Sequence, residues 1–241
     1  SCLVGHEFHS RFILGSGKYN SHLIRAAVEY ADARSSRSPC AVPIPDQKRI
    51  FWTYPEERNA AAEHIRRKKA EEAIRIARLA RKMAGTDFVK VEIMRDSKYL
   101  LPDNQETIKA TEVLANEALS LCLTCILDLN VARDLAMQRR LYHAARIADG
   151  SNKGLATKDF IQILIDEIDL PIIVDAGIGR PSQACEAMEM GALIMANTAI
   201  ATAGDIPMMA SAFKDAIIAG RKAYLAGPGA YSTRAAPLPI L

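Results

Sequence analysis

Short apolar runs of strand length alternate with amphipathic helical patterns along this sequence, and this alternation limits the possible folds more than any other feature. The spacing predicts strands over residues 12–14, 88–94, 121–127, 170–175 and 192–196. It predicts helices over residues 23–30, 60–84, 105–119, 130–144, 157–168, 181–191 and 206–220. Strands that alternate with helices are typical of βα units around a parallel sheet. The expected fold class is therefore α/β.

The length of 241 residues suits one (β/α)8 TIM barrel, in which each of eight parallel strands precedes a helix. We expect a single domain over residues 1–241, with a short N-terminal lead-in and a loosely held tail at 228–241. A closed barrel requires further strands from residues 35–59 and 144–148. Several prolines within 35–59 argue against a central strand through most of that stretch.

The charge and the cysteines bear on the partners and the compartment. The 31 basic and 28 acidic residues nearly balance, which favours small anionic ligands over nucleic acid. The five cysteines are an odd number in a chain long enough to fold without disulfides, which favours a reducing compartment. No apolar run reaches the roughly 18–20 residues of a membrane span, and the N-terminal residues lack a signal-peptide core. We therefore expect a cytoplasmic protein that binds neither membranes nor nucleic acid.

The strand expected at 88–94 carries the first candidate catalytic residues. Successive side chains of a strand point to opposite faces, so Val89, Val91 and Ile93 share one face, and Lys90 and Glu92 share the other. In a barrel the apolar face packs on helices, which directs Lys90 and Glu92 into the interior. Desolvation favours the neutral amine, the form that attacks a carbonyl to make a Schiff base, and Glu92 is placed to move protons. A structural ion pair, or an edge strand with both groups in water, is the alternative.

Asp175 ends an otherwise apolar strand, and active sites of barrels collect at the C-terminal ends of the strands. Gly177 and Gly179 permit close approach of a ligand to the backbone, and the helix beginning near Pro181 would offer N–H groups to a phosphate. An aspartate that only caps a turn is the alternative interpretation.

Two more loops follow strands in the same way. Asn197 and Thr198 come directly after the strand at 192–196, where such barrels commonly bind a phosphate. Residues 150–154 form a glycine-flanked loop rich in hydrogen-bond donors. Each loop is a weak signal alone, but their shared position after strands favours a phosphate site.

Other signals favour ordinary structural roles. Cys122 and Cys125 have the CxxC spacing but lie in an apolar strand without a second pair, which indicates buried thiols rather than a zinc or redox site. The basic run at 66–69 has glutamates nearby and indicates a solvated helix face. His64 and His143 have no companions at metal-ligand spacing, so we expect no metal site.

Several segments carry a resemblance to a known family. They are SRFILGSGKY at 10–19, AEEAIRIARLA at 70–80, VKVE at 89–92, LLPD at 100–103, GSNKGLAT at 150–157, PIIVDAGIG at 171–179, NTAIA at 197–201 and AGRKAYLAG at 219–227. In these segments and their order the chain resembles the bacterial thiazole synthases, (β/α)8 barrels that build the thiazole phosphate of thiamin. The resemblance implies that Lys90 forms the imine and that Glu92 and Asp175 are the acid/base carboxylates. The substrate- and phosphate-binding positions that it implies are Gly150, Ala176, Gly177, Asn197 and Thr198.

The resemblance also implies the substrates and partners. Lys90 would condense with the ketone of 1-deoxy-D-xylulose 5-phosphate, and the imine would tautomerise. Sulfur would come from the C-terminal thiocarboxylate of a small carrier protein, and dehydroglycine, supplied by an oxidase or lyase, would complete the ring. The family assembles as homo-oligomers, and its subunit holds no metal or organic cofactor.

Two long stretches depart from the family pattern, at residues 35–69 and 121–149. They contain the second-strand segment and the approach to Gly150. A Schiff-base aldolase acting on another phosphorylated sugar, and a catalytically inactive phosphate-binding barrel, therefore stay open as alternatives.

Overall fold

One sheet of parallel strands forms the centre of the structure, a computed structural model that describes residues 2–3, 6–7, 11–14, 42–43, 50–51, 69–84, 88–95, 101–126, 128–137, 141–146, 154–175 and 177–229. The sheet has six strands in the order β3-β10-β9-β8-β7-β6, and every neighbouring pair is parallel. The strands are β3 (Phe12–Leu14), β6 (Phe88–Val91), β7 (Ser120–Cys125), β8 (Leu141–Arg146), β9 (Ile172–Asp175) and β10 (Leu193–Ala196). The α/β class with parallel strands is therefore confirmed.

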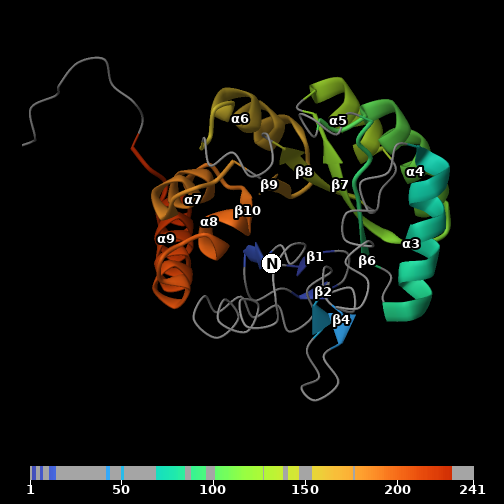
Figure 1. The fold of residues 1–241 in the computed structure, drawn as a ribbon. Coiled ribbons are helices and arrows are strands. Elements are labelled where there is room, and N and C mark those ends of the chain that lie inside the picture. Colours follow the sequence, from blue (N-terminus) through green and yellow to red (C-terminus); the bar gives the residue numbers. More distant parts are fainter. Residues whose placement is uncertain are drawn as a thin grey trace, which may run out of the picture.

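The helices lie outside the sheet, as Figure 1 shows. They are α3 (Ala70–Ala84), α4 (Asn104–Asn116), α5 (Leu129–Ala136), α6 (Lys158–Glu167), α7 (Pro181–Glu189), α8 (Thr198–Ala201) and α9 (Ile206–Ala226). Three of them begin where a preceding aspartate accepts a hydrogen bond from a free N–H group of the first turn: Asp103 at α4, Asp128 at α5 and Asp205 at α9. These caps determine where three of the helices that alternate with the strands begin.

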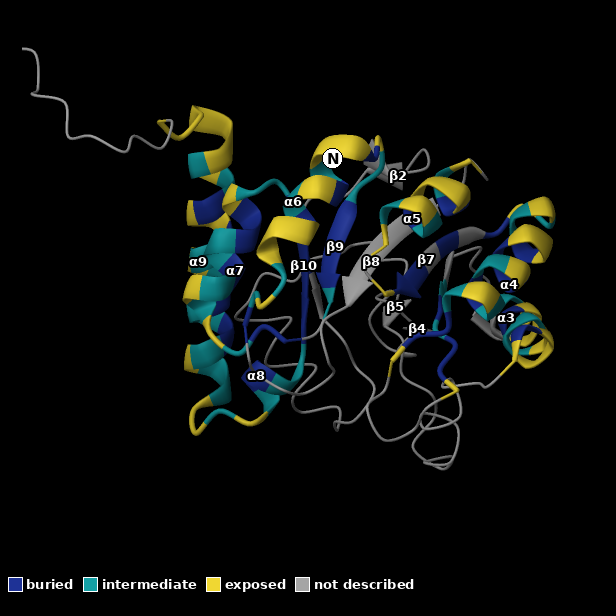
Figure 2. Cartoon of the chain, turned by 90° about the horizontal axis from the view of Figure 1, so that it is seen from above, coloured by how far each residue is buried: buried dark blue, intermediate teal, exposed yellow. Residues whose placement is uncertain are grey.

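The apolar faces of the strands pack against the helices. Leu121, Leu123 and Cys125 of β7 belong to a buried cluster with residues of α3 and α4. Val174 of β9 and Ile194 of β10 belong to a second cluster with residues of α7 and α9. Figure 2 shows the same layering, with buried strands and helices whose outer faces are exposed. The opposite faces of these strands are therefore left to form the interior side of the sheet.

One expected helix is wrong in its second half. The pattern over residues 130–144 predicts a single helix, but α5 ends at Ala136, and residues 141–146 form β8. Pairing with β7 on one side and β9 on the other determines this strand, and tertiary pairing of that kind overrides the local helical spacing. The extra strand expected at 144–148 therefore overlaps the C-terminal half of β8.

The stretch at 35–59 contributes no strand to the parallel sheet among its described residues. Its two described segments, β4 (Val42–Pro43) and β5 (Ile50–Phe51), pair antiparallel with each other. Near the N-terminus, β1 (Cys2–Leu3) and β2 (His6–Glu7) form a second short antiparallel pair. Within the described residues the parallel sheet thus has six strands.

At its C-terminal end the described chain leaves α9 at Gly227, whose φ of 72° lies in the left-handed region that favours glycine. Of the tail expected at 228–241, residues 230–241 lie outside the described residues. None of the helices in the described ranges is both long enough and apolar enough to cross a membrane.

Candidate active site

Lys90 projects from β6 into the interior side of the sheet. Its neighbours Val91 and Ile93 are buried in the apolar cluster beneath α3 and α4. The alternation of the strand therefore places Lys90 and Glu92 on the opposite face, as the sequence predicts.

The Lys90 amine contacts a carboxylate from a distant strand. Lys90 Nζ donates a hydrogen bond to Asp175 Oδ2 at 2.5 Å, and Asp175 is the last residue of β9. Because β6 and β9 are three places apart in the sheet, a flat sheet would separate them by about 14 Å. A lysine and an aspartate side chain cannot span that distance together. The contact therefore requires the sheet to curve strongly around its interior.

Two further groups surround the amine. Glu92 Oε2 lies 3.6 Å from Lys90 Nζ, and Met195 Sδ lies 3.5 Å from it. Met195 is the register partner of Asp175 on β10, so both side chains share the interior face. The Lys90 side chain is 22% exposed, and those of Glu92 and Asp175 are each 13% exposed. The structure thus brings together the three residues predicted as catalytic, Lys90, Glu92 and Asp175. With Met195 they form what we call the Lys90 group.

This arrangement suits imine chemistry. A lysine amine attacks a carbonyl only after it gives up a proton, and a carboxylate in direct contact can accept that proton. A second carboxylate nearby can move protons on the adduct while the first stays with the amine nitrogen. Partial burial limits competing water and strengthens the electrostatic interactions within the group.

The turn after Asp175 is built on a glycine. Gly177 has a φ of 81°, and its carbonyl accepts a hydrogen bond from Gly154 N at 2.7 Å. Two N–H groups ahead of α7, those of Gly179 and Arg180, donate to Gln183 Oε1. Gln183 therefore already accepts hydrogen bonds from two backbone N–H groups near the start of α7, where the sequence predicts a phosphate.

The remaining predicted binding residues divide into two groups. Asn197 and Thr198 follow β10 at the edge of the sheet where Asp175 ends β9, and Asn197 Oδ1 is buried without a hydrogen-bond partner in the described part of the chain. Gly150 and Ala176 lie outside the described residues.

Sequence reasoning missed two interior residues. Met195 lies against the amine, and Thr124 of β7 is fully buried on the same side of the sheet as Lys90. Strand alternation within 192–196 and 121–127 indicates both, because Met195 and Thr124 lie on the faces opposite those that pack on the helices.

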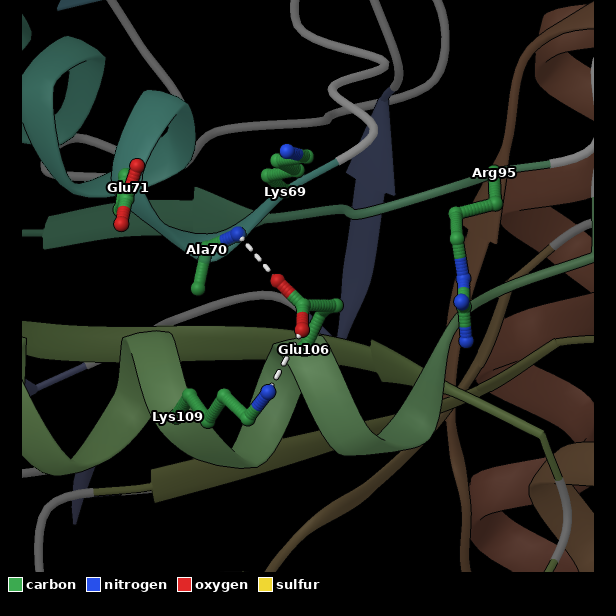
Figure 3. Close-up of a pocket in the computed structure, with 6 residues that line it drawn as sticks. All are labelled: Lys69, Ala70, Glu71, Arg95, Glu106 and Lys109. Carbon is green, nitrogen blue, oxygen red and sulfur yellow. Dashed lines mark hydrogen bonds and ion pairs between the residues drawn. The ribbon is translucent and has the colours of Figure 1, made fainter.

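A separate pocket lies between the start of α3 and α4, and none of its lining residues belongs to the Lys90 group (Figure 3). There Glu106 Oε2 accepts a hydrogen bond from the N–H of Ala70 at 2.7 Å, and Glu106 Oε1 accepts one from Lys109 Nζ at 2.8 Å. These hydrogen bonds, that of Lys109 first, lower the pKa of Glu106. The carboxylate therefore acts as a cap for α3 that a different helix supplies.

Within the described ranges, no group of three His, Cys, Asp or Glu side chains could hold a metal ion.

Comparison with known proteins gives the family. The family model described as "Thiazole biosynthesis protein ThiG" matches residues 2–238. The chain belongs to the ThiG family. The resemblance inferred from the sequence motifs is thereby confirmed.

Curated members of the ThiG family match nearly the whole chain. A thiazole synthase of Clostridium beijerinckii is 61% identical over 230 residues, which are 94% of this chain and 90% of that protein. A thiazole synthase of Fusobacterium nucleatum is 56% identical and covers 92% of this chain and 88% of its own length. These relatives are enzymes, and this ThiG-family chain is an enzyme of thiazole biosynthesis.

Two solved structures have a similar fold. The chain matches the crystal structure of the Amycolatopsis orientalis BexX/CysO complex with a TM-score of 0.76 and 27% identity, over 96% of this chain and 98% of that one. A tryptophan synthase structure from Mycobacterium tuberculosis matches with a TM-score of 0.50 and 14% identity, over 86% of this chain and 90% of that one, which is a likeness of fold alone.

Proposed function

We propose that this ThiG-family chain makes thiazole phosphate through an imine on Lys90. The observation that carries the proposal is the position of the Lys90 amine, 2.5 Å from Asp175 and 3.6 Å from Glu92 inside a curved parallel sheet. The substrates are 1-deoxy-D-xylulose 5-phosphate, dehydroglycine and the thiocarboxylate of a sulfur-carrier protein.

The first steps follow from the chemistry of this group. Asp175 accepts a proton from Lys90, and the neutral amine attacks the ketone carbon of the sugar phosphate. Loss of the carbonyl oxygen as water gives the imine, and the returning proton for that water comes from a carboxylic acid of the pair. Glu92 then removes a proton from the carbon next to the imine, which gives the tautomer that reacts with the sulfur donor. The thiocarboxylate sulfur replaces the carbonyl oxygen of this tautomer, so the carrier leaves as a carboxylate. Dehydroglycine adds the remaining C–N unit, its nitrogen takes the place of the Lys90 nitrogen, and the ring closes with loss of water.

The other parts of the proposal concern binding and assembly. Gly150, Ala176, Gly177, Asn197 and Thr198 hold the substrate and its phosphate at the edge of the sheet where β9 and β10 end. The six described strands belong to a closed (β/α)8 barrel that is a single domain over residues 1–241 of a cytoplasmic protein. No metal or organic cofactor takes part.

The carrier protein docks on this barrel, which is supported by the BexX/CysO complex, in which a protein of similar fold is bound to a second protein. We include in the proposal that the chain forms homo-oligomers and that a separate oxidase or lyase supplies dehydroglycine.

The test is sulfur-dependent product formation. The protein is incubated with 1-deoxy-D-xylulose 5-phosphate, glyoxylate with ammonium as a source of dehydroglycine, and a carrier protein bearing a C-terminal thiocarboxylate. Thiazole phosphate is expected by mass spectrometry only when the thiocarboxylate is present. Lys90→Arg keeps the positive charge but forms no imine, and it should yield no product, whereas Lys158→Arg on the exposed face of α6 should match the parent.

Two other outcomes would replace the proposal. Carbon–carbon bond cleavage or formation on a phosphorylated sugar without any sulfur donor would indicate the aldolase alternative. Binding of the sugar phosphate without turnover, unchanged in Lys90→Ala, would indicate a phosphate-binding barrel.

A further inference from the structure

Thr124 carries a buried hydroxyl group whose role the imine chemistry does not explain. Thr124 is 0% exposed, and its Oγ1 has no hydrogen-bond partner in the part of the chain that the structure describes. A buried polar group without a partner costs the folded state free energy, and valine has the same shape without that cost. An unpaired hydroxyl at such a position therefore needs a reason.

The side chain of Thr124 faces the interior. Leu121, Leu123 and Cys125 of β7 all pack in the cluster beneath α3 and α4. Because successive side chains of a strand alternate, Thr124 points to the opposite face, the one from which Lys90 projects. Thr124 is thus a polar residue on the interior face of β7, the side of the sheet along which the Lys90 side chain extends.

The strand register places Thr124 midway between the two groups of the ion pair. Lys90 is the partner of Cys122, two residues before Thr124 on β7. In the other direction Thr124 pairs with Ala144, and Ala144 pairs with Ile173, two residues before Asp175. The amine of Lys90 crosses the interior on this side of the sheet to reach Asp175.

We propose that the Thr124 hydroxyl is a substrate-contacting group, which hydrogen-bonds a hydroxyl of the sugar chain carried as an imine on Lys90. This inference rests on the proposed function. A 1-deoxyxylulose chain has hydroxyl groups on the two carbons that follow its ketone, so a chain attached to Lys90 Nζ brings polar groups into the interior. The movement of the amine from Asp175 to the substrate opens the space above β7, and the hydroxyl then gains its partner.

The contact distinguishes a polyhydroxylated ketose phosphate from a plain ketone phosphate. A buried hydroxyl that pairs with a substrate hydroxyl rejects an analogue that lacks it, because the protein group is then left unpaired. Thr124 would thereby act as a specificity-determining residue.

The test combines a change in the protein with a change in the ligand. Imine formation is measured by borohydride trapping with 1-deoxy-D-xylulose 5-phosphate and with 5-phosphooxypentan-2-one, which has the same carbon chain without the two hydroxyls. For Thr124→Val we expect the half-saturating concentration of the sugar phosphate to rise about tenfold and that of the plain ketone to change less than about twofold. Thr124→Ser keeps the hydroxyl and should stay near the parent with both.

Thr107 offers a matched control. Its Oγ1 on α4 is also fully buried and has no hydrogen-bond partner among the described residues, but it lies outside the Lys90 group. Thr107→Val should leave trapping of both ketones unchanged. The melting temperature of Thr124→Val should equal or exceed that of the parent, because the valine removes an unpaired buried hydroxyl. If Thr124→Val fails to fold, Thr124→Ala replaces it in the trapping experiment.

The results separate this inference from the proposed function. Equal losses with the two ketones, or no loss with the sugar phosphate, would overturn the role of Thr124 while a Lys90 adduct in the parent leaves the imine chemistry standing. A parent protein that forms no adduct with either ketone would overturn both.

Discussion

Replacing Lys90 with methionine would remove the positive charge between two largely buried carboxylates while keeping a side chain of similar length. With an effective dielectric of about 20, contacts of 2.5 Å to Asp175 and 3.6 Å to Glu92 correspond to roughly 7 and 5 kcal/mol of attraction, most of which desolvation offsets. Removing one partner of a buried pair costs about 3–5 kcal/mol, because the other charge stays behind. With the Lys90 side chain 22% exposed, we expect the lower end, about 3 kcal/mol of unfolding free energy.

Urea unfolding of five proteins tests this expectation: the parent, Lys90→Met, Asp175→Asn, the double variant, and Lys158→Met as a control. The double variant Lys90→Met with Asp175→Asn removes the charges of Lys90 and Asp175 and leaves that of Glu92. It should recover about 2 kcal/mol of unfolding free energy relative to Lys90→Met alone. Lys158→Met removes an exposed ion pair with Glu186, 3.1 Å long and with side chains 56% and 43% exposed, and should cost less than about 1 kcal/mol. Equal stability of Lys90→Met and the parent, or the same effect of Asp175→Asn in both backgrounds, would refute the ion pair.

Three further predictions concern the rest of the fold. Glu106→Gln should destabilise the protein at neutral pH but not in acid. The hydrogen bond from Lys109 lowers the pKa of Glu106, so the stability that the Glu106 carboxylate contributes is lost as the pH falls through that lowered pKa. Urea midpoints at pH 7 and pH 3.5 check this. Gly220→Ala, which would usually favour a helix, should instead cost about 1–3 kcal/mol in urea unfolding, because the new Cβ would meet the carbonyl of Cys185 on α7. Burial raises the pKa of the Cys125 thiol to about 12, so iodoacetamide at pH 8 should label Cys125 only after unfolding, as peptide mass spectrometry would show.

The fold was predictable where one local signal was strong. The strands at 170–175 and 192–196 are continuous apolar runs, and both were predicted close to their observed bounds as β9 and β10. The failure at β8 has a physical cause. Leu141–Arg146 mixes apolar, aromatic and basic residues, and its strand conformation is determined by the strands on either side of it. Such pairing is not contained in the local spacing.

The members of the candidate site were predictable, but their contacts were not. Strand alternation is a local property, and it indicates Lys90 and Glu92. The position of Asp175 at the end of a strand indicates Asp175. The contact between Lys90 and Asp175 depends on the curvature of four strands, which no local pattern expresses. Thr124 was missed because a single polar residue within an apolar run does not by itself indicate a functional site.

Borohydride trapping of the imine shows whether Lys90 is the amine that reacts with the ketone. The protein is incubated with 1-deoxy-D-xylulose 5-phosphate and borohydride, digested, and analysed by mass spectrometry for the reduced adduct. We expect about one adduct per chain, on Lys90, absent from Lys90→Arg and formed at least about 100-fold more slowly in Asp175→Asn. The absence of an adduct, or an adduct on a surface lysine such as Lys158, would contradict this expectation.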